Sequence, residues 1–171
     1  MDPQGATKII AAQSSLTNKG LKILTEKIPE HGSCFVCGKT NPKSIGVEWE
    51  LGPEGHIVAS FRFNKYQQGP PGFVHGGASA AIMDEAMGLA VFYAGYRVVT
   101  ANMMIEYHKP IPLGKLITIQ AEMSGKTERR ILALGEILLP DGSVAVSAKG
   151  TYAEANHFFD KIPDQFLRPK R

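Results

Sequence analysis

Residues 76–94 form an almost continuous apolar stretch, and Gly95 follows it as a stop signal. The apolar positions leave no polar face of the kind that a surface helix presents, so we predict a helix that is buried on most sides. Two adjacent carboxylates, Asp84 and Glu85, interrupt it. An ionised carboxylate in apolar surroundings costs free energy unless it is paired, hydrogen-bonded or wet. This pair is therefore the first place to look for chemistry.

The segments on both sides of this helix alternate between apolar and polar residues as strands do. Two predicted strands, 45–51 and 57–63, precede the helix and form a hairpin around a turn at 53–55. Four more predicted strands follow it, at 97–109, 116–124, 130–139 and 144–155. One helix among antiparallel neighbours favours an α+β fold, in which a single sheet packs on one long helix, over a parallel βαβ alternation.

The remaining segments flank one folded domain. We expect an N-terminal extension over 1–44, with a short helix that Pro29 ends and a cysteine loop after it. The domain itself spans 45–156, and a basic C-terminal tail spans 157–171. A chain of 171 residues is long enough for one domain with a full core.

Composition narrows the classes of partner. The formal net charge of +3 is too small to predict a nucleic-acid partner. No segment has the length or the apolar character of a secretory signal or a membrane span, so we expect no membrane partner. The two cysteines do not make a disulfide-dense secreted domain, and we expect a cytoplasmic protein.

A motif opens the apolar helix: His75-Gly76-Gly77, with the acidic residue Asp84 nine positions after the histidine. Together with the flanking segments 66–74, 99–102 and 109–114, it resembles the hotdog-fold acyl-CoA thioesterases, and their phenylacetate-pathway branch in particular. The resemblance implies the hotdog fold, a curved antiparallel sheet wrapped around one long central helix, with two subunits paired across their sheets. It also implies hydrolysis of an acyl or aryl thioester, from coenzyme A or a related carrier, to the acid and free thiol without a cofactor.

The same resemblance assigns roles to individual residues. Asp84 is expected to be the general base or nucleophile, the Gly76 N–H to polarise the thioester carbonyl, and Thr100 to serve the nucleophile. His75 is a further catalytic candidate, although a histidine at this place more often orients the loop through hydrogen bonds from its ring. One departure stands out, since many relatives carry Asn or Gln six residues before the histidine, where this chain has Gly69.

We also expect a set of substrate contacts. Apolar side chains around the helix are predicted to line the acyl pocket, and glycine, amide and lysine groups to meet the rest of the substrate. The expected lining residues are Met83, Met87, Phe92, Phe73 and Met103, and the other expected contacts are Gly77, Gln68 and Lys109.

The spacing of the two central groups predicts an oligomer. Gly76 and Asp84 lie eight residues apart, or about 12 Å along one helix. The N–H groups of a first helical turn can stabilise an oxyanion, but base and oxyanion donor must both lie within about 3 Å of the reacting atoms. One helix cannot bring them that close. The sequence therefore predicts a homodimer with two shared sites, or a homotetramer that contains such pairs.

The second carboxylate, Glu85, points about 100° away from Asp84 around the helix. Only one of the two can face a given site, and the register favours Asp84. We expect Glu85 to pair with a base such as Arg97 or to face solvent.

The cysteine loop has metal-ligand spacing. His31, Cys34 and Cys37 offer three ligands, whereas a structural zinc site needs four. A fourth would have to come from a partner subunit or from His157. We favour a reduced cysteine pair packed as small apolar residues, without a bound metal.

The sequence is also consistent with two other functions. One is a non-catalytic hotdog module that binds acyl thioesters or a protein partner, which the glycine at position 69 supports. The other is a hydratase or dehydratase acting on hydroxyacyl thioesters. That chemistry needs an acid and a base placed for proton transfer at carbon, which the spacing from His75 to Asp84 does not suggest.

Overall fold

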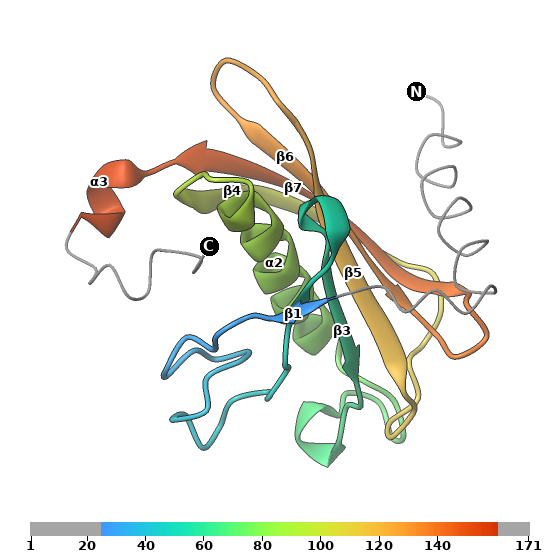
Figure 1. Cartoon of the computed structure of the whole chain (residues 1–171). Helices are drawn as coiled ribbons and strands as arrows, with labels where there is room; N and C mark the ends of the chain where they lie inside the picture. The colour runs from blue at the N-terminus through green and yellow to red at the C-terminus, as the bar shows by residue number, and fades with distance from the viewer. Residues whose placement is uncertain (1–24, 161–171) are drawn as a thin grey trace.

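The structure, a computed structural model, describes residues 25–160. One antiparallel sheet of seven strands carries the fold, in the order β1-β2-β3-β5-β6-β7-β4. The strands are β1 (Glu26–Lys27), β2 (Glu50–Leu51), β3 (Ile57–Phe61), β4 (Val98–Tyr107), β5 (Ile117–Lys126), β6 (Ile131–Leu138) and β7 (Val144–Glu154). The sheet curves around one long helix, which confirms the predicted α+β hotdog architecture (Figure 1).

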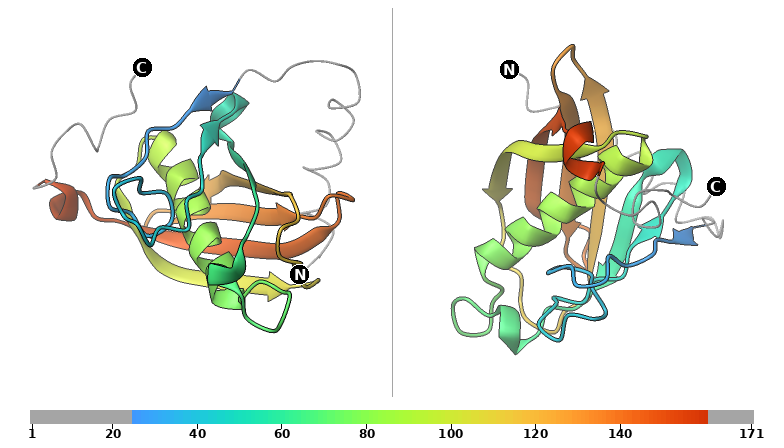
Figure 2. Two further views of the ribbon diagram at one scale, coloured as in Figure 1. Left: turned by 90° about the horizontal axis from the view of Figure 1, so that it is seen from below. Right: turned by 90° about the vertical axis from the view of Figure 1, so that its left-hand side faces the viewer.

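The central helix, α2 (Gly76–Tyr93), packs lengthwise against the sheet (Figure 2). Ile82, Met83 and Met87 on its sheet side are fully buried. Burying side chains of this size contributes about 1.5–3 kcal/mol each. The other helical segments are short: η1 (Pro53–Gly55), η2 (Lys65–Gln67) and α3 (Asn156–Phe159). Within residues 25–160, no helix has the length and apolar character to cross a membrane.

Local signals set both ends of α2. The side chain of His75 accepts a hydrogen bond from the Gly77 N–H and so caps the first turn. At the other end Gly95 adopts φ +98°, a conformation that favours glycine, and its N–H donates to the Phe92 carbonyl. The helix therefore begins and ends where the sequence predicts.

The N-terminal part differs from the prediction. Most of the predicted short helix lies outside the described residues, and its described end, Glu26–Lys27, is a strand that pairs with β2. In the predicted strand 45–51, the alternating residues Ile45, Val47 and Trp49 are buried as expected, but only the last two residues enter the sheet. The first part of that segment is held by burial on the core and by hydrogen bonds from its N–H groups to the Phe35 and Val36 carbonyls, rather than by pairing in the sheet.

Strand β4 contains a bulge that controls which side chains face the helix. The pairing with β7 shifts between Thr100 and Asn102, so Ala101 is the extra residue. Strict alternation would put Thr100 and Met103 on opposite faces of the sheet. With the extra residue, Thr100 reaches α2 while Met103 still packs against the core.

Strand β4 is also an open edge. It ends the sheet order, and within residues 25–160 it pairs on one side only, with β7. Its ten residues include one charge, Glu106, and no proline or lysine that would discourage pairing with another strand. Large apolar side chains are exposed on it: Val99, Met104 and Tyr107.

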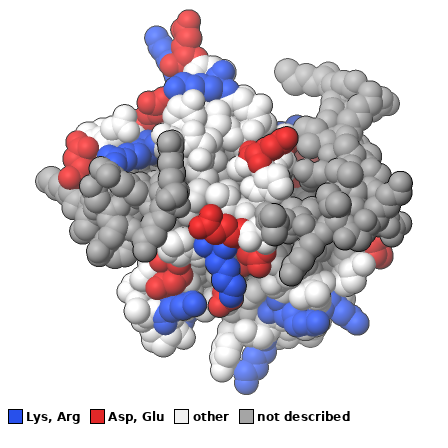
Figure 3. Space-filling model, in the orientation of Figure 1, with Lys and Arg blue, Asp and Glu red and all other residues white. Residues whose placement is uncertain are grey.

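The charged side chains do not form a field of one sign on the face seen in Figure 3. Basic and acidic groups are interspersed there over a largely uncharged surface. This distribution agrees with the small net charge of the chain and does not indicate a polyanionic partner.

Candidate active site

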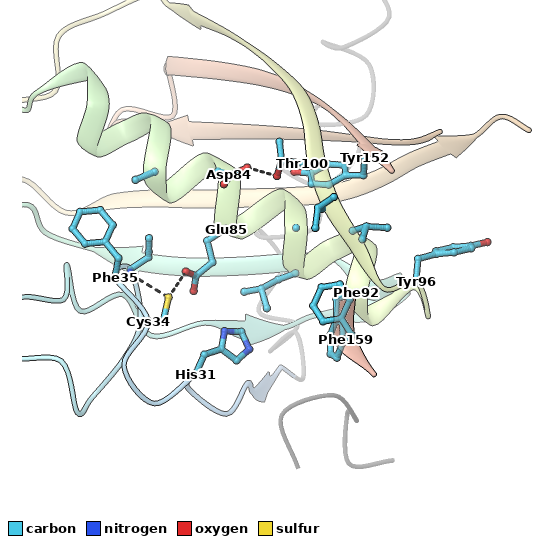
Figure 4. Close-up of a pocket in the computed structure, with 16 residues that line it drawn as sticks. His31, Cys34, Phe35, Asp84, Glu85, Phe92, Tyr96, Thr100, Tyr152 and Phe159 are labelled. Carbon is cyan, nitrogen blue, oxygen red and sulfur yellow. Dashed lines mark hydrogen bonds between the residues drawn. The ribbon is translucent and has the colours of Figure 1, made fainter. Parts of the chain in front are cut away.

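A carboxylate–hydroxyl pair lies at the centre of the site. The Thr100 hydroxyl donates a hydrogen bond of 2.7 Å to Asp84 Oδ1, which joins the middle of α2 to the start of β4 (Figure 4). Both residues line a cavity of about 700 Å³, together with the apolar side chains of Leu89, Phe92 and Val98. A carboxylate held in this way can accept a proton from water or attack a carbonyl carbon itself.

A buried tyrosine lies next to the pair of Asp84 and Thr100. Tyr152 on β7 is the cross-strand partner of Thr100 and lines the same cavity. Its hydroxyl is buried and has no hydrogen-bond partner within residues 25–160. Burial, with the negative charge of Asp84 adding to it, raises the pKa of Tyr152 well above its ordinary value. The phenol therefore stays neutral beside the carboxylate.

Gly150 makes room for this tyrosine. A Cβ at position 150 would lie 2.6 Å from the ring of Tyr152, much closer than carbon atoms approach one another. The ring of Tyr152 therefore lies directly over the backbone of Gly150. The sequence alone singles out neither residue, because the contact between them appears only in the folded strand.

The start of α2 forms the second part of the site. The Gly76 N–H meets no acceptor within residues 25–160, as expected for the first turn of a helix. The Tyr107 hydroxyl donates to the Gly76 carbonyl at 3.0 Å, which fixes this turn against β4. The ring of His75 is occupied as a helix cap, so it orients the loop rather than presenting a free nitrogen at Nδ1.

The two parts are separate within one chain. His75, Gly77 and Gln68 line a second cavity of about 700 Å³, whereas Asp84 lines the first. Eight residues of straight helix, about 12 Å, stand between Gly76 and Asp84. A single subunit thus brings Asp84 and Thr100 together but does not bring the helix start to them.

Steric crowding explains why position 69 is a glycine. A Cβ there would lie 2.9 Å from the Cα of His75, so Asn or Gln would displace the backbone of the motif. The neighbouring Gln68 faces the second cavity, but its Oε1 accepts the Gly72 N–H and so also holds the loop.

Only some of the predicted substrate contacts line one of the two cavities. Phe92 lines the Asp84 cavity, and Gly77 and Gln68 line the second one. Met83 and Met87 line neither cavity of the single chain; they are fully buried against Gly135 on the sheet side, and their contact with an acyl group stays a prediction. The other three predicted contacts line neither cavity of the single chain: Phe73, Met103 and Lys109.

The prediction for Glu85 was wrong. It neither pairs with Arg97 nor faces solvent: its Oε2 accepts from Cys34 Sγ at 2.8 Å and its Oε1 from Trp49 Nε1 at 2.9 Å. Figure 4 shows Asp84 directed toward Thr100 and Glu85 directed away from it, toward Cys34 and His31. Tertiary contacts from the cysteine loop and from the extended segment before β2 decide this, and no local pattern reveals them.

A sequence model of the thioesterase superfamily matches residues 71–146. The match covers the whole of α2, with the candidate residues His75, Gly76, Asp84 and Thr100, and reaches into β7. Over these residues the chain is similar to the thioesterase superfamily. A crystal structure of a thioesterase superfamily protein is similar with a TM-score of 0.71 and 27% identity, over 88% of this chain and 77% of that one.

Curated relatives of the chain include animal proteins that are named acyl-coenzyme A thioesterases. The acyl-coenzyme A thioesterase THEM4 of Rattus norvegicus is 35% identical over 73% of this chain and 53% of its own length. The THEM4 protein of Xenopus laevis is 32% identical over 64% of this chain and 46% of its own length. The chain thus spans about half the length of the curated relatives it matches. The fold alone is shared with the PaaI protein of E. coli, at 18% identity and a TM-score of 0.62, over 68% of this chain and 85% of that one.

Proposed function

We propose that this protein hydrolyses acyl-CoA thioesters, with a site that two subunits share. The observation that carries the proposal is the Asp84 carboxylate, held by Thr100 in a cavity with apolar walls. The names of the THEM4 relatives support acyl-coenzyme A as the substrate class. Apolar walls suit an acyl or aryl chain.

The chemistry needs few groups. Asp84 takes a proton from a water molecule as that water attacks the thioester carbonyl carbon, and Thr100 keeps the carboxylate in place. The Gly76 N–H, at the positive end of the α2 dipole, donates to the carbonyl oxygen as negative charge develops on it. The carbon–sulfur bond then breaks and the thiolate leaves as coenzyme A. No organic cofactor is required.

A second subunit completes the site in this proposal. The open edge of β4 supports an antiparallel pairing with the β4 of another copy. Within one chain Thr100 contacts Asp84, and Tyr107 contacts Gly76. A two-fold axis near the middle of β4, close to Met103 and Met104, sets Thr100 of one subunit opposite Tyr107 of the other. Asp84 then approaches the helix start of its partner rather than its own. A tetramer would contain two such pairs.

The second candidate function is an acyl-thioester-binding module without turnover. Gly69 favours it, because the close approach of His75 leaves no room there for an amide that could hold the carbonyl or the water. The two functions differ in a simple observable, since both bind acyl-CoA but only the enzyme releases a thiol.

A thiol-release assay with short-chain, long-chain and aromatic acyl-CoAs tests the proposal. The wild-type chain should release coenzyme A from at least one class, and Asp84→Asn should release almost none while it still binds that substrate. Tight binding by the wild-type chain without thiol release across the whole panel would favour the binding module.

A further inference from the structure

A cluster of metal-ligand side chains lies next to the Asp84 cavity, outside the chemistry described above. His31, Cys34 and Cys37 come from the loop 31–41, and Glu85 comes from the middle of α2. One ligand atom from each residue lies within 4.8 Å of the other three. The sequence offers only the first three ligands at close spacing, and the fold adds the fourth. We propose that these four residues bind one zinc ion, which fastens the loop to α2.

The distances suit a tetrahedral ion. Around zinc, with Zn–S near 2.3 Å and Zn–N near 2.0 Å, ligand atoms lie about 3.3–3.8 Å apart. Cys37 Sγ lies 3.7 Å from His31 Nδ1, and Cys34 Sγ lies 2.8 Å from Glu85 Oε2. Side-chain adjustments of about 1 Å are enough to close the four ligands around an ion.

The loop itself is built to present two sulfur atoms on one side. The Val36 N–H donates to Cys34 Sγ at 3.3 Å, a contact that favours a negatively charged sulfur. Gly38, directly after Cys37, packs so tightly that a Cβ there would lie 2.3 Å from the Cys34 nitrogen. Only glycine fits this turn, and the turn brings Cys34 and Cys37 together.

Trp49 orients the fourth ligand. Its Nε1 donates to Glu85 Oε1 at 2.9 Å, while Oε2 accepts from Cys34 Sγ at 2.8 Å. Metal-binding carboxylates are commonly held by such an outer hydrogen bond. The arrangement also accounts for a second carboxylate on an otherwise apolar helix, which needs partners for its charge.

The ligand set indicates the metal and its role. Two thiolates, an imidazole and a carboxylate favour zinc over magnesium or calcium, which prefer oxygen ligands alone. Four protein ligands fill a tetrahedral site and leave no position for a catalytic water. The ion is therefore structural: it holds one wall of the cavity, one residue away from Asp84.

Two arrangements without metal compete with this proposal. In the first, the Cys34 thiol donates to Glu85 and the cluster is satisfied by hydrogen bonds. In the second, Cys34 and Cys37, which are free thiols in the structure, form a disulfide. Zinc content and thiol content separate all three.

The test uses the full chain, purified without a polyhistidine tag or chelators, and measures zinc by elemental analysis together with free thiols. We expect about one zinc per chain. Cys37→Ser and Glu85→Gln should each weaken zinc binding at least tenfold, and Trp49→Phe by about tenfold. Glu48→Gln is the matched control: this exposed carboxylate pairs with Lys27 and Lys39, and its loss should leave the zinc content unchanged.

A measurement on the wild-type chain covers the case in which a variant does not fold. After removal of zinc, added Co²⁺ should give the visible absorption of a tetrahedral cobalt–thiolate site. Wild-type protein without zinc and without this cobalt spectrum would overturn the proposal, as would a Cys34–Cys37 disulfide in freshly isolated protein. Neither readout depends on thioester hydrolysis. The zinc site and the proposed activity are therefore tested independently of each other.

Discussion

Thr100 and Asp84 are joined by a hydrogen bond of 2.7 Å between β4 and the middle of α2. The bulge at Ala101 makes this contact possible, because it lets Thr100 face the helix together with Met103. The carboxylate of the proposed general base is thereby fixed by an element other than its own helix.

Replacing Asp84 by Asn removes the general base and keeps the size of the side chain. We expect kcat for thiol release to fall by about 10²–10⁴-fold, the range for a positioned acid or base. Thr100→Val should lower kcat with a smaller loss, whereas Thr100→Ser keeps the hydroxyl and should retain most of the activity. Steady-state kinetics on one acyl-CoA checks all three variants, and full activity in Asp84→Asn would refute the role of this residue.

Gly76→Pro removes the N–H of the first helical residue and adds a ring at the same place. Proline is favoured at the first position of a helix, and His75 already has the extended φ and ψ that a residue before proline adopts. Removing one oxyanion donor costs about 10²–10³-fold in kcat. Gly76→Ala adds a Cβ at the same place, 3.3 Å from the ring of Tyr107, but keeps the N–H, so it is the matched control. Equal losses in both variants would indicate crowding rather than a lost donor.

Gly150→Ala should destabilise the fold, because the new Cβ would meet the ring of Tyr152 at 2.6 Å. Crowding of this kind in a packed core costs about 1–3 kcal/mol. Tyr152→Phe should leave stability unchanged or slightly higher, since the hydroxyl it removes has no partner within residues 25–160. Denaturant unfolding of both variants measures the difference. A loss above about 1 kcal/mol in Tyr152→Phe would reveal a bound partner for that hydroxyl.

Met104→Lys should weaken the dimer. Near a two-fold axis through the middle of β4, two copies of the new lysine would lie close together, and like charges on facing strands are unfavourable. We expect sedimentation analysis to show a shift toward monomer, with thiol release falling in parallel. Met104→Leu keeps the apolar surface and should remain a dimer. A Met104→Lys protein that stays dimeric and fully active would exclude this edge as the interface.

Much of the fold could be predicted because its signals are local. The apolar stretch with its histidine cap and Gly95 defines α2, and alternation defines the long strands β4 to β7. The expectation that Thr100 serves the nucleophile rests on a family resemblance, not on periodicity, and its contact with Asp84 is seen only in the structure. Alternation alone gives no sign of the bulge at Ala101 that aims Thr100 at the helix.

Other features depend on contacts between distant segments. Glu85 has two hydrogen-bond partners, Cys34 and Trp49. They come from a loop and an extended segment far from α2 in the sequence. The burial of Met87 depends on Gly135, since a side chain at that position would fill the space the methionine occupies. Helical spacing gives the direction of a side chain around the axis, but not the element that covers it.

The central claim is that Asp84 of one subunit and Gly76 of the other act on one carbonyl. Heterodimers made from an Asp84→Asn subunit and a Gly76→Pro subunit, purified through two different tags, test it most directly. One of the two sites in such a dimer keeps both groups, so about half of the wild-type thiol release should return although each homodimer is nearly inactive. Heterodimers as inactive as the parent variants would contradict a shared site.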